Sequence, residues 1–275
     1  TQVSCFGTST GSATVAAFGG TSPYSYLWSN TQTTATVSNL AAGTYNVTVT
    51  DNKGCTSTSS VTITQPTALA ASISSPTHVL CYGGNNGNAS VSVTGGTPSY
   101  VYSWSNGQST SSISNLYAGT YTVTVTDNNS CTSTASVTIT QPTIISITPS
   151  STNVSCNGGS NGAASINTPT GGTPSYTYNW TPGNPTGDGT ASVTGLTSGT
   201  WTCTVTDANA CTATKTFNIT QPTSIVVSPV SQTNISCFGG SNGAASVSTT
   251  GGAGGFFTYN WTPGNPTGDG TASVT

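Results

Sequence analysis

The stretch GTYTVTVTDNNSC, residues 119–131, contains the features that decide the predicted fold. From Tyr121 to Thr126, bulky apolar side chains alternate with threonines, which is the period-two pattern of a half-buried β-strand. The strand is followed by Asp127, two asparagines, a serine and Cys131. This ending is compatible with three structures: a metal site, a reactive thiol beside a carboxylate, or a turn closed by a disulfide.

Variants of this stretch recur along the chain at regular intervals. Each copy begins at a cysteine followed by glycines, continues through GGTPSYVYSW or a variant of it, and, where complete, ends in TITQPT or NITQPT. The initial cysteines are 76, 75 and 81 residues apart: Cys5, Cys81, Cys156 and Cys237. Such self-similarity predicts a tandem array of small domains.

The predicted repeats 1 to 4 span residues 1–67, 68–143, 144–223 and 224–275. Repeat 1 is expected to lack the strand that precedes the initial cysteine in the later copies. Repeat 4 is expected to be truncated, because the sequence stops before a GTY strand and a second cysteine appear. We therefore expect the chain to be a portion of a longer array.

Within a repeat the segments alternate with period two, and none shows the period of a helix. Turn residues interrupt them about every eight to twelve positions, which is typical of a sandwich of short strands. Trp104 in an early strand and Tyr121 at the start of a late strand match the core tryptophan and the corner tyrosine of an immunoglobulin-like domain. We predict an all-β chain of tandem immunoglobulin-like β-sandwich domains in an extended rod, with joints stiffened by Pro66, Pro142 and Pro222.

Aromatic residues recur at fixed places in these strands. Those expected in the cores are Trp28, Trp104, Trp180, Trp261, Tyr45, Tyr121 and Trp201. The first tyrosine of each Tyr-x-Tyr-x-Trp row is expected to be the most exposed, and these are the candidate ligand-facing aromatics: Tyr24, Tyr100 and Tyr176. A row on one strand face could stack on a sugar, but packing in the core is the favoured interpretation.

Each complete repeat holds two cysteines near its ends, and this spacing predicts one disulfide per repeat. The predicted pairs are Cys5–Cys55, Cys81–Cys131 and Cys156–Cys211. A loop of about 50 residues closed in this way stabilises a domain by about 4 kcal/mol, which a repeat this small is expected to need. Disulfides indicate an oxidising, extracellular setting. A zinc site is disfavoured, because no C-x-x-C motif and no nearby histidine occur.

Two cysteines remain outside these pairs. Cys237 begins the truncated repeat, so its partner is expected beyond Thr275. Cys203 occupies the position of Val47 and Val123 in the earlier repeats. We therefore expect Cys203 to be a buried small hydrophobic residue.

Charged residues make up only 3% of the chain, whereas ordinary soluble domains have roughly 25%. Two lysines, Lys53 and Lys215, cannot neutralise a phosphate backbone, so no nucleic-acid partner is expected. The only histidine, His78, is expected in a loop rather than in a catalytic site. No run of 18 apolar residues occurs, so no membrane insertion is expected. No cluster of unlike polar residues suggests an enzyme, and no catalytic residue is predicted.

Three aspartates recur four residues before a cysteine, at the end of the same strand: Asp51, Asp127 and Asp207. Calcium is an alternative ligand here, but its sites usually require several carboxylates, and each repeat offers one at this place. Aspartate also initiates turns by bonding its own backbone. The favoured interpretation is a hairpin turn without a cofactor. Asp188 and Asp269, each in a GDG sequence, are expected at turn tips as well.

The combined pattern resembles the SprB repeat of large cell-surface adhesins in gliding bacteria of the Bacteroidetes. It consists of C-x-G-x-x-x-G-x-A, G-G-T-P-x-Y-x-Y-x-W, L-x-x-G-T-Y-x-V-x-V-x-D-x-x-x-C and T-I-T-Q-P. The resemblance implies type IX secretion, display on the cell surface and a filament that supports attachment and gliding motility. The implied partners are neighbouring repeats, with the motility and secretion machinery and surface polysaccharide contacted through other regions. Cys203, Trp201 and GGAGGFF in repeat 4 depart from the pattern.

The sequence therefore predicts a structural segment of an adhesin stalk. Two alternatives remain at this point: an array of carbohydrate-binding modules, and spacer domains of a larger extracellular enzyme. An ice-binding function is less favoured, because the threonine-rich faces are short and interrupted by turns.

Overall fold

The computed structural model describes residues 1–264 and 266–275, and Asn265 of predicted repeat 4 lies outside the described residues. Over the described ranges the regular secondary structure consists of β-strands, with no helix. The chain forms two compact units, Thr1–Gln141 and Pro142–Thr275. The first unit contains repeats 1 and 2, and the second contains repeats 3 and 4. The boundary between the units lies two residues before the predicted start of repeat 3 at 144.

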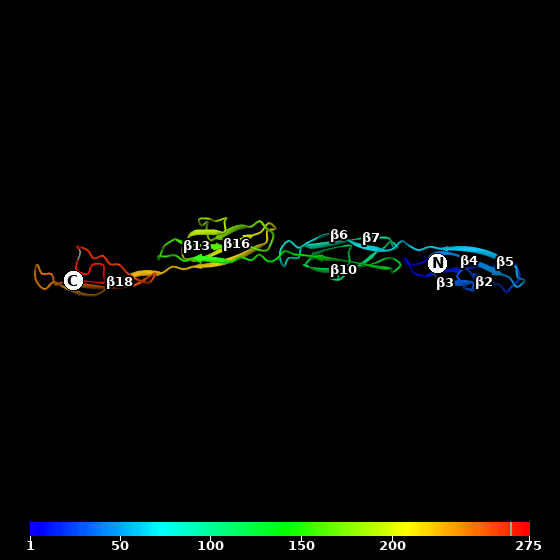
Figure 1. Cartoon of the computed structure of the whole chain (residues 1–275), viewed down its shortest axis with the longest axis horizontal. Helices are drawn as coiled ribbons and strands as arrows, with labels where there is room; N and C mark the ends of the chain where they lie inside the picture. The colour runs from blue at the N-terminus through cyan, green and yellow to red at the C-terminus, as the bar shows by residue number, and fades with distance from the viewer. Residues whose placement is uncertain (265) are drawn as a thin grey trace. The chain divides into compact units, whose positions relative to one another are not determined.

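Repeat 2 is a complete sandwich of two three-stranded antiparallel sheets, part of which is labelled in Figure 1. One sheet has the order β6 (Ala70–Thr77), β7 (Gly87–Thr94), β9 (Ser112–Leu116). The other has the order β8 (Val101–Trp104), β10 (Gly119–Thr126), β11 (Thr132–Ile139). In chain order this is the A-B-E and C-F-G arrangement of an immunoglobulin-like domain, which confirms the predicted fold class.

The register of β10 explains why the alternating sequence forms this sheet. Val123 pairs with Trp104 on β8 and with Ala135 on β11, so small and large apolar side chains meet on the inner face. Val123 and Val125 are fully buried, and Trp104 is 3% exposed. On the outer face, the hydroxyls of Thr120 and Thr138 lie 3.2 Å apart across the strand pair. The period-two pattern therefore separates an apolar core from a hydroxyl-covered surface.

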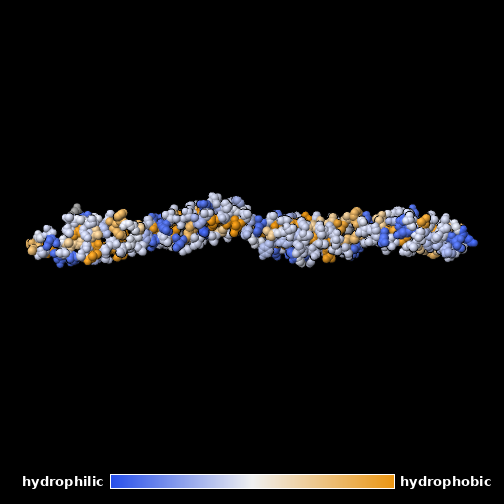
Figure 2. Space-filling view, turned by 60° about the horizontal axis from the view of Figure 1, so that its bottom comes forward, coloured by the Kyte–Doolittle hydropathy of each residue, from blue (hydrophilic) through white to orange (hydrophobic). Residues whose placement is uncertain are grey.

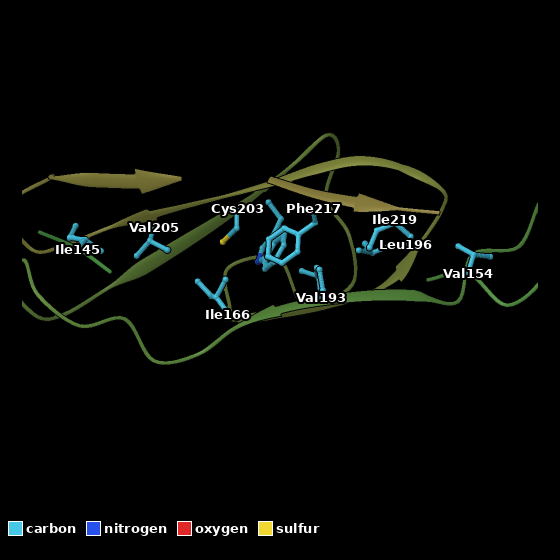
Figure 3. Close-up of a cluster of buried hydrophobic side chains, with 11 residues drawn as sticks. Ile145, Val154, Ile166, Val193, Leu196, Cys203, Val205, Phe217 and Ile219 are labelled. Atoms are coloured by element: carbon cyan, nitrogen blue, oxygen red, sulfur yellow. The ribbon is translucent and has the colours of Figure 1, made fainter. Parts of the chain in front are cut away.

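Repeat 3 repeats this arrangement in the second unit. Its sheets have the orders β12 (Pro149–Thr152), β13 (Gly162–Ile166), β15 (Ser192–Leu196) and β14 (Thr177–Thr181), β16 (Gly199–Thr206), β17 (Thr212–Ile219). Figure 3 shows its core, in which Phe217 and Cys203 extend from the upper strands and Val193 and Ile166 from the lower ones. The ring of Phe217 lies 5.2 Å from that of Trp180.

Repeat 1 has the same plan with one strand fewer. A two-stranded sheet of β1 (Gly11–Thr14) and β3 (Thr36–Leu40) faces the sheet β2 (Ser25–Trp28), β4 (Gly43–Thr50), β5 (Thr56–Ile63). Among the described residues no strand pairs with β1 in the way that β6 pairs with β7.

The described part of repeat 4 has one sheet, with the order β18 (Thr223–Thr233), β19 (Ala244–Gly252), β20 (Ser273–Val274). Every residue of β18 is exposed. Trp261 is half-buried, and the described residues of repeat 4 form one sheet, so its place in a closed core stays a prediction.

The surface is weakly polar rather than charged. The face shown in Figure 2 is mostly pale, the colour of intermediate hydropathy, with small separate blue and orange areas. This agrees with a chain in which serine and threonine are abundant and charged residues are 3% of the total.

Candidate functional site: the aspartate hairpin and the loop that it holds

The hairpin between β10 and β11 is organised by the carboxylate of Asp127. Its Oδ1 atom accepts hydrogen bonds from the N–H groups of Asn129 and Cys131, both at 2.9 Å. Its Oδ2 atom accepts from the N–H of Thr97 at 2.8 Å, in the loop before β8. The side chain therefore shapes its own turn and fastens that turn to the neighbouring loop.

The equivalent aspartates make the same contacts. Asp51 accepts from the N–H groups of Lys53 and Cys55 and from Thr21. Asp207 accepts from Asn209, Cys211 and Thr173. The predicted turn role of these three aspartates is thus confirmed. Asp188 and Asp269 also lie in turns, where each accepts from the N–H of the preceding tryptophan, Trp180 or Trp261.

These contacts lower the pKa of the carboxyl groups. Burial raises the pKa of Asp127, but the hydrogen bonds from Thr97, Cys131 and Asn129 outweigh it, so the pKa lies below its ordinary value of 3.8. The pKa of Asp207 is lowered by the same balance. For Asp51, the hydrogen bond from Thr21 contributes most to the lowering.

The geometry does not favour calcium at these positions. Both carboxylate oxygens of Asp127 already face N–H donors, which a cation would have to replace. Within residues 1–264 and 266–275, no group of three or more His, Cys, Asp or Glu side chains is placed to hold a metal ion. Calcium usually takes six to eight oxygen ligands.

The Gly95–Gly96 turn before β8 packs against the carboxylate of Asp127. The ideal Cβ of an alanine at Gly96 would lie 2.8 Å from Oδ2 of Asp127, so a side chain at this position would collide with the carboxylate. The hydroxyl of Tyr100 donates to the carbonyl of Gly95 at 2.7 Å. The tyrosine is half-buried as a result.

The candidate ligand-facing tyrosines therefore do not form an open aromatic platform. Tyr24 and Tyr176 donate to the carbonyls of Gly19 and Gly171, as Tyr100 does to Gly95, and all three side chains are half-buried. Tyr100 and Tyr176 also pack against the cores of their repeats. Their position favours the core interpretation over sugar stacking.

The remaining predicted core aromatics are close to their expected places. Trp28, Trp104 and Trp180 are buried, and each donates its indole N–H to a backbone carbonyl. Tyr45 and Tyr121 are half-buried against the core and donate to the carbonyl four residues upstream, Ala41 and Tyr117. This is the corner hydrogen bond that the sequence predicts.

Trp201 keeps the same bond with a different group. Its indole N–H donates to the carbonyl of Thr197 at 3.1 Å, again four residues upstream. The change from tyrosine to tryptophan in repeat 3 therefore keeps the corner hydrogen bond, because either an O–H or an indole N–H can serve as the donor.

In repeats 1 to 3 the initial cysteine lies in a short loop at the opposite end of the sandwich from the aspartate hairpin. In repeat 2, the N–H of Gly83 donates to Oε1 of Gln141, and Val79 donates to the carbonyl of Thr140. Gln65 and Gln221 bind Gly7 and Gly158 in the same way. The recurrence of T-Q-P at the end of repeats 1 to 3 thus has a structural cause, because its glutamine holds the cysteine loop. Sequence reasoning missed this function, although the motif itself was visible.

Within the first unit a disulfide joins Cys5 to Cys131, so it links repeat 1 to repeat 2. The Cα atoms are 5.7 Å apart, and the two residues are separated by 126 positions. Beside the bond, Nδ2 of Asn129 donates to the carbonyl of Ser4 at 3.0 Å and to Oγ1 of Thr97 at 3.0 Å. The aspartate hairpin of one repeat therefore holds the cysteine loop of the repeat before it.

The predicted pairs within single repeats are wrong. Cys5 and Cys131 bond to each other, so Cys5–Cys55 and Cys81–Cys131 do not form. Cys55 and Cys156 are free thiols, so Cys156–Cys211 does not form either. The physical reason is that the two cysteines of one repeat lie at opposite ends of an eight-residue strand such as β11. That strand is roughly 27 Å long, whereas disulfide Cα atoms lie within about 7 Å of each other.

Cys203 is buried in the core of repeat 3, as predicted (Figure 3). Burial raises the pKa of its thiol to about 11, with a further contribution from the charge of Asp188. It is therefore a poor nucleophile at neutral pH. The other free cysteines, Cys55, Cys156 and Cys237, are exposed.

His78 lies in a loop, where Nδ1 accepts a hydrogen bond from the N–H of Thr140 at 3.1 Å. The position agrees with the predicted loop residue. In the described part of the chain, no helix is long and apolar enough to cross a membrane.

The strand order and the recurring two-cysteine frame define a tandem immunoglobulin-like repeat protein. The family model described as the SprB repeat matches residues 1–33, 73–109, 148–185 and 230–266, which together exceed half of the chain. The chain therefore belongs to the SprB repeat family. The repeat recognised from the sequence is thus confirmed.

Several solved structures are similar to parts of the chain. An amphioxus IgVJ-C2 molecule shares 17% identity over 51% of this chain and 98% of its own, with a TM-score of 0.26. The Dpr2 Ig1-Ig2 fragment, from its complex with DIP-Theta, shares 10% identity over 72% of this chain and 89% of its own, with a TM-score of 0.26. Murine CEACAM1b shares 12% identity over 56% of this chain and 99% of its own, with a TM-score of 0.23. No curated protein matches the chain.

Proposed function

We propose that the chain is a segment of the structural stalk of a secreted cell-surface adhesin, and that its function is to transmit load from repeat to repeat. Membership of the SprB repeat family supports the adhesin class. The observation that carries the load-bearing function is the Cys5–Cys131 disulfide, which joins two successive domains within the first unit.

The disulfide lies beside the polypeptide connection between repeats 1 and 2. A pull on repeat 1 is therefore carried by a covalent bond as well as by the joint that contains Pro66. Closing a loop of 126 residues also stabilises the folded state by about 5 kcal/mol in the chain-entropy model. A tethered segment with these properties suits a long projection that is stretched during attachment.

The proposed setting is the cell surface. Disulfides persist outside the cytosol, and a weakly charged surface rich in hydroxyl groups does not favour nucleic acid. The proposal includes export through the type IX system and a role in gliding. Antibodies raised against the chain are expected to bind intact cells that produce it and to reduce their attachment to glass.

Single-molecule pulling on the full chain tests the load-bearing function. The oxidised chain, held by its two ends, is expected to reach a shorter maximum extension than the reduced chain, because part of the sequence between Cys5 and Cys131 is shielded from force. The Cys131→Ser variant is expected to extend further than the wild type under oxidising conditions. Equal extensions for all three would contradict the proposal.

A glycan-binding screen distinguishes the stalk from a carbohydrate-binding array. The stalk proposal expects no binding that depends on Tyr24, Tyr100 or Tyr176. Binding that is lost in the Tyr→Ala variants but kept in Tyr→Phe variants would point to a lectin-like function instead, because phenylalanine preserves the stacking face.

A further inference from the structure

The side chain of Asn129 lies between two repeats. Its Nδ2 atom donates to the carbonyl of Ser4 in repeat 1 and to Oγ1 of Thr97 in repeat 2, both at 3.0 Å. Its own carbonyl oxygen lies 4.0 Å from the sulfur of Cys5 and 4.0 Å from that of Cys131. This one residue therefore contacts the main chain beside the first cysteine and both sulfur atoms of the disulfide.

The direction of this amide is fixed within repeat 2. The N–H of Asn129 donates to Oδ1 of Asp127 at 2.9 Å, and the N–H of Thr97 donates to Oδ2 of the same carboxylate at 2.8 Å. The hydroxyl of Thr97 then accepts from Nδ2 of Asn129. Repeat 3 contains the same pair, in which Asn209 donates to Oγ1 of Thr173 at 2.9 Å. Each repeat thus orients its own asparagine.

The carbonyl of Ser4 is held in place by repeat 1. The N–H of Ser4 donates to Oγ1 of Thr10 at 2.8 Å, on the other side of the loop. The N–H of Gly7 donates to Oε1 of Gln65 at 2.8 Å. These hydrogen bonds do not involve the disulfide, so both halves of the junction can form before the two sulfur atoms are joined.

Cys5 and Cys131 pair in a chain that has eight cysteines. They lie on separate domains, and the joint between these domains contains Pro66. The effective concentration of one thiol at the other therefore depends on how closely the two domains are held together. A hydrogen bond between the hairpin and the loop restricts the joint and keeps the sulfur atoms close.

We propose that Asn129 selects Cys131 as the partner of Cys5, because its amide binds the carbonyl of Ser4 and holds the two thiols together before the disulfide forms. Asn129 is a positioning residue in this exchange, since its side chain neither gains nor loses electrons or protons. The inference rests on the hydrogen bonds of the first unit and does not require the load-bearing function.

The oxidant for this bond is a low-molecular-weight disulfide such as oxidised glutathione. The thiolate of Cys5 attacks it, forms a mixed disulfide and releases one glutathione thiolate. The thiolate of Cys131 then attacks the sulfur of Cys5 and releases the second glutathione thiolate. Two protein thiols lose two electrons, the small disulfide gains them, and the two protons pass to the released thiolates. The second step requires both cysteines to be close, so it is the step that Asn129 favours.

The test compares variants of the full chain in a glutathione redox buffer. Peptide mass mapping gives the ratio of the Cys5–Cys131 bond to the mixed disulfides of these two cysteines with glutathione. In Asn129→Ala this ratio is expected to fall about five-fold, the effect of losing one hydrogen bond. Asn129→Asp keeps the shape of the side chain but has no N–H to donate, so the ratio is expected to fall at least as far.

Two control variants separate positioning from stability. Asn128→Ala changes the neighbouring exposed asparagine and is expected to leave the ratio unchanged. Tyr121→Phe removes the corner hydrogen bond to Tyr117, at the opposite end of β10 from the hairpin. It is expected to lower the urea unfolding midpoint of repeat 2 without changing the ratio.

Three results would overturn the proposal. The first is an unchanged ratio in Asn129→Ala, and the second is a ratio in Asn129→Asp equal to that of the wild type, which would show that shape rather than the donor matters. The third is an equal fall in Tyr121→Phe, which would attribute the effect to the stability of repeat 2. In each case the oxidised wild type could still reach a shorter extension than the reduced chain, so the load-bearing function is judged separately.

Discussion

The carboxylate of Asp127 accepts hydrogen bonds from three backbone N–H groups that belong to two different loops. Hydrogen bonds to a charged group are stronger than neutral ones, so a single side chain can position the cysteine beside it. The aspartate carboxylate thus organises this end of the sandwich in repeats 1 to 3. The three hairpins therefore make a contribution to the free energy of unfolding that depends on pH.

We expect the chain to lose stability when the pH falls below the ordinary aspartate pKa of 3.8. The folded-state pKa values of Asp51, Asp127 and Asp207 are lowered, so their stabilisation is complete above that value and is lost as the pH falls through the folded-state values. Urea unfolding midpoints measured between about pH 6 and pH 3 should show this decline.

The triple variant Asp→Asn at these three positions is the control. Its urea unfolding midpoint is expected to be lower than that of the wild type at neutral pH and to change less as the pH falls. A wild-type midpoint that stays constant to the lowest pH would contradict the prediction.

At Trp201 the donor group, rather than the ring, is the feature to test. Trp201→Phe should destabilise repeat 3 by about 1 kcal/mol, because the carbonyl of Thr197 loses its donor. Trp201→Tyr should recover most of this loss, since a tyrosine makes the equivalent bond in repeats 1 and 2. Chemical denaturation of the three proteins measures both effects, and equal losses for Phe and Tyr would exclude the hydrogen bond as the cause.

At the scale of the strand and the turn, the Gly-Gly pair offers a comparison between two repeats. Gly19 and Gly95 have similar positive φ values, 76° and 68°. A Cβ on Gly95 would lie 2.0 Å from the carbonyl oxygen of Ala68, next to β6, whereas a Cβ on Gly19 has open space around it.

Gly19→Ala is therefore expected to cost about 1–2 kcal/mol, the penalty of the left-handed conformation alone. Gly95→Ala is expected to cost clearly more, because the backbone before β6 must move as well. The difference between the losses of unfolding free energy in the two variants measures how strongly the backbone before β6 constrains the turn in repeat 2. Equal costs would show that β6 does not constrain this turn.

The strand β16 contains a second test, at Cys203. Because its thiol is buried and has a pKa raised to about 11, Cys203 should not react with a thiol reagent at neutral pH in the folded chain. Cys55, Cys156 and Cys237 should react quickly. Cys203→Val should change stability by less than about 1.5 kcal/mol, and Cys203→Ser should cost more, since it buries a hydroxyl. Rapid labelling of Cys203 would contradict the buried position.

Much of the strand pattern was predictable because alternation and turn residues are local signals. Trp104, Val123 and Tyr121 lie where their spacing places them, and the corner bond follows from the same spacing. The half-buried state of Tyr100 was less predictable, because its hydroxyl donates to the carbonyl of Gly95, in a turn whose position the local pattern does not give. Trp261 depends on strands that the described part of repeat 4 does not contain.

For the whole molecule, the cysteine pairing was the main failure of sequence reasoning. The spacing of Cys5 and Cys55 suggests a loop within one repeat, but spacing gives no information about which end of a sandwich a loop occupies. The structure shows that the partner of Cys5 lies 126 residues away. Only the three-dimensional strand order reveals that the nearest second cysteine belongs to the next domain.

The scarcity of charged residues also limits where trypsin can cleave this protein. Trypsin has two sites in 275 residues, Lys53 in an exposed turn and Lys215 within β17. A brief digestion should therefore cut after Lys53 first. The two pieces would stay together on a non-reducing gel, because residue 5 and residue 131 lie on opposite sides of the cut and are covalently joined, and they would separate once a reductant is added.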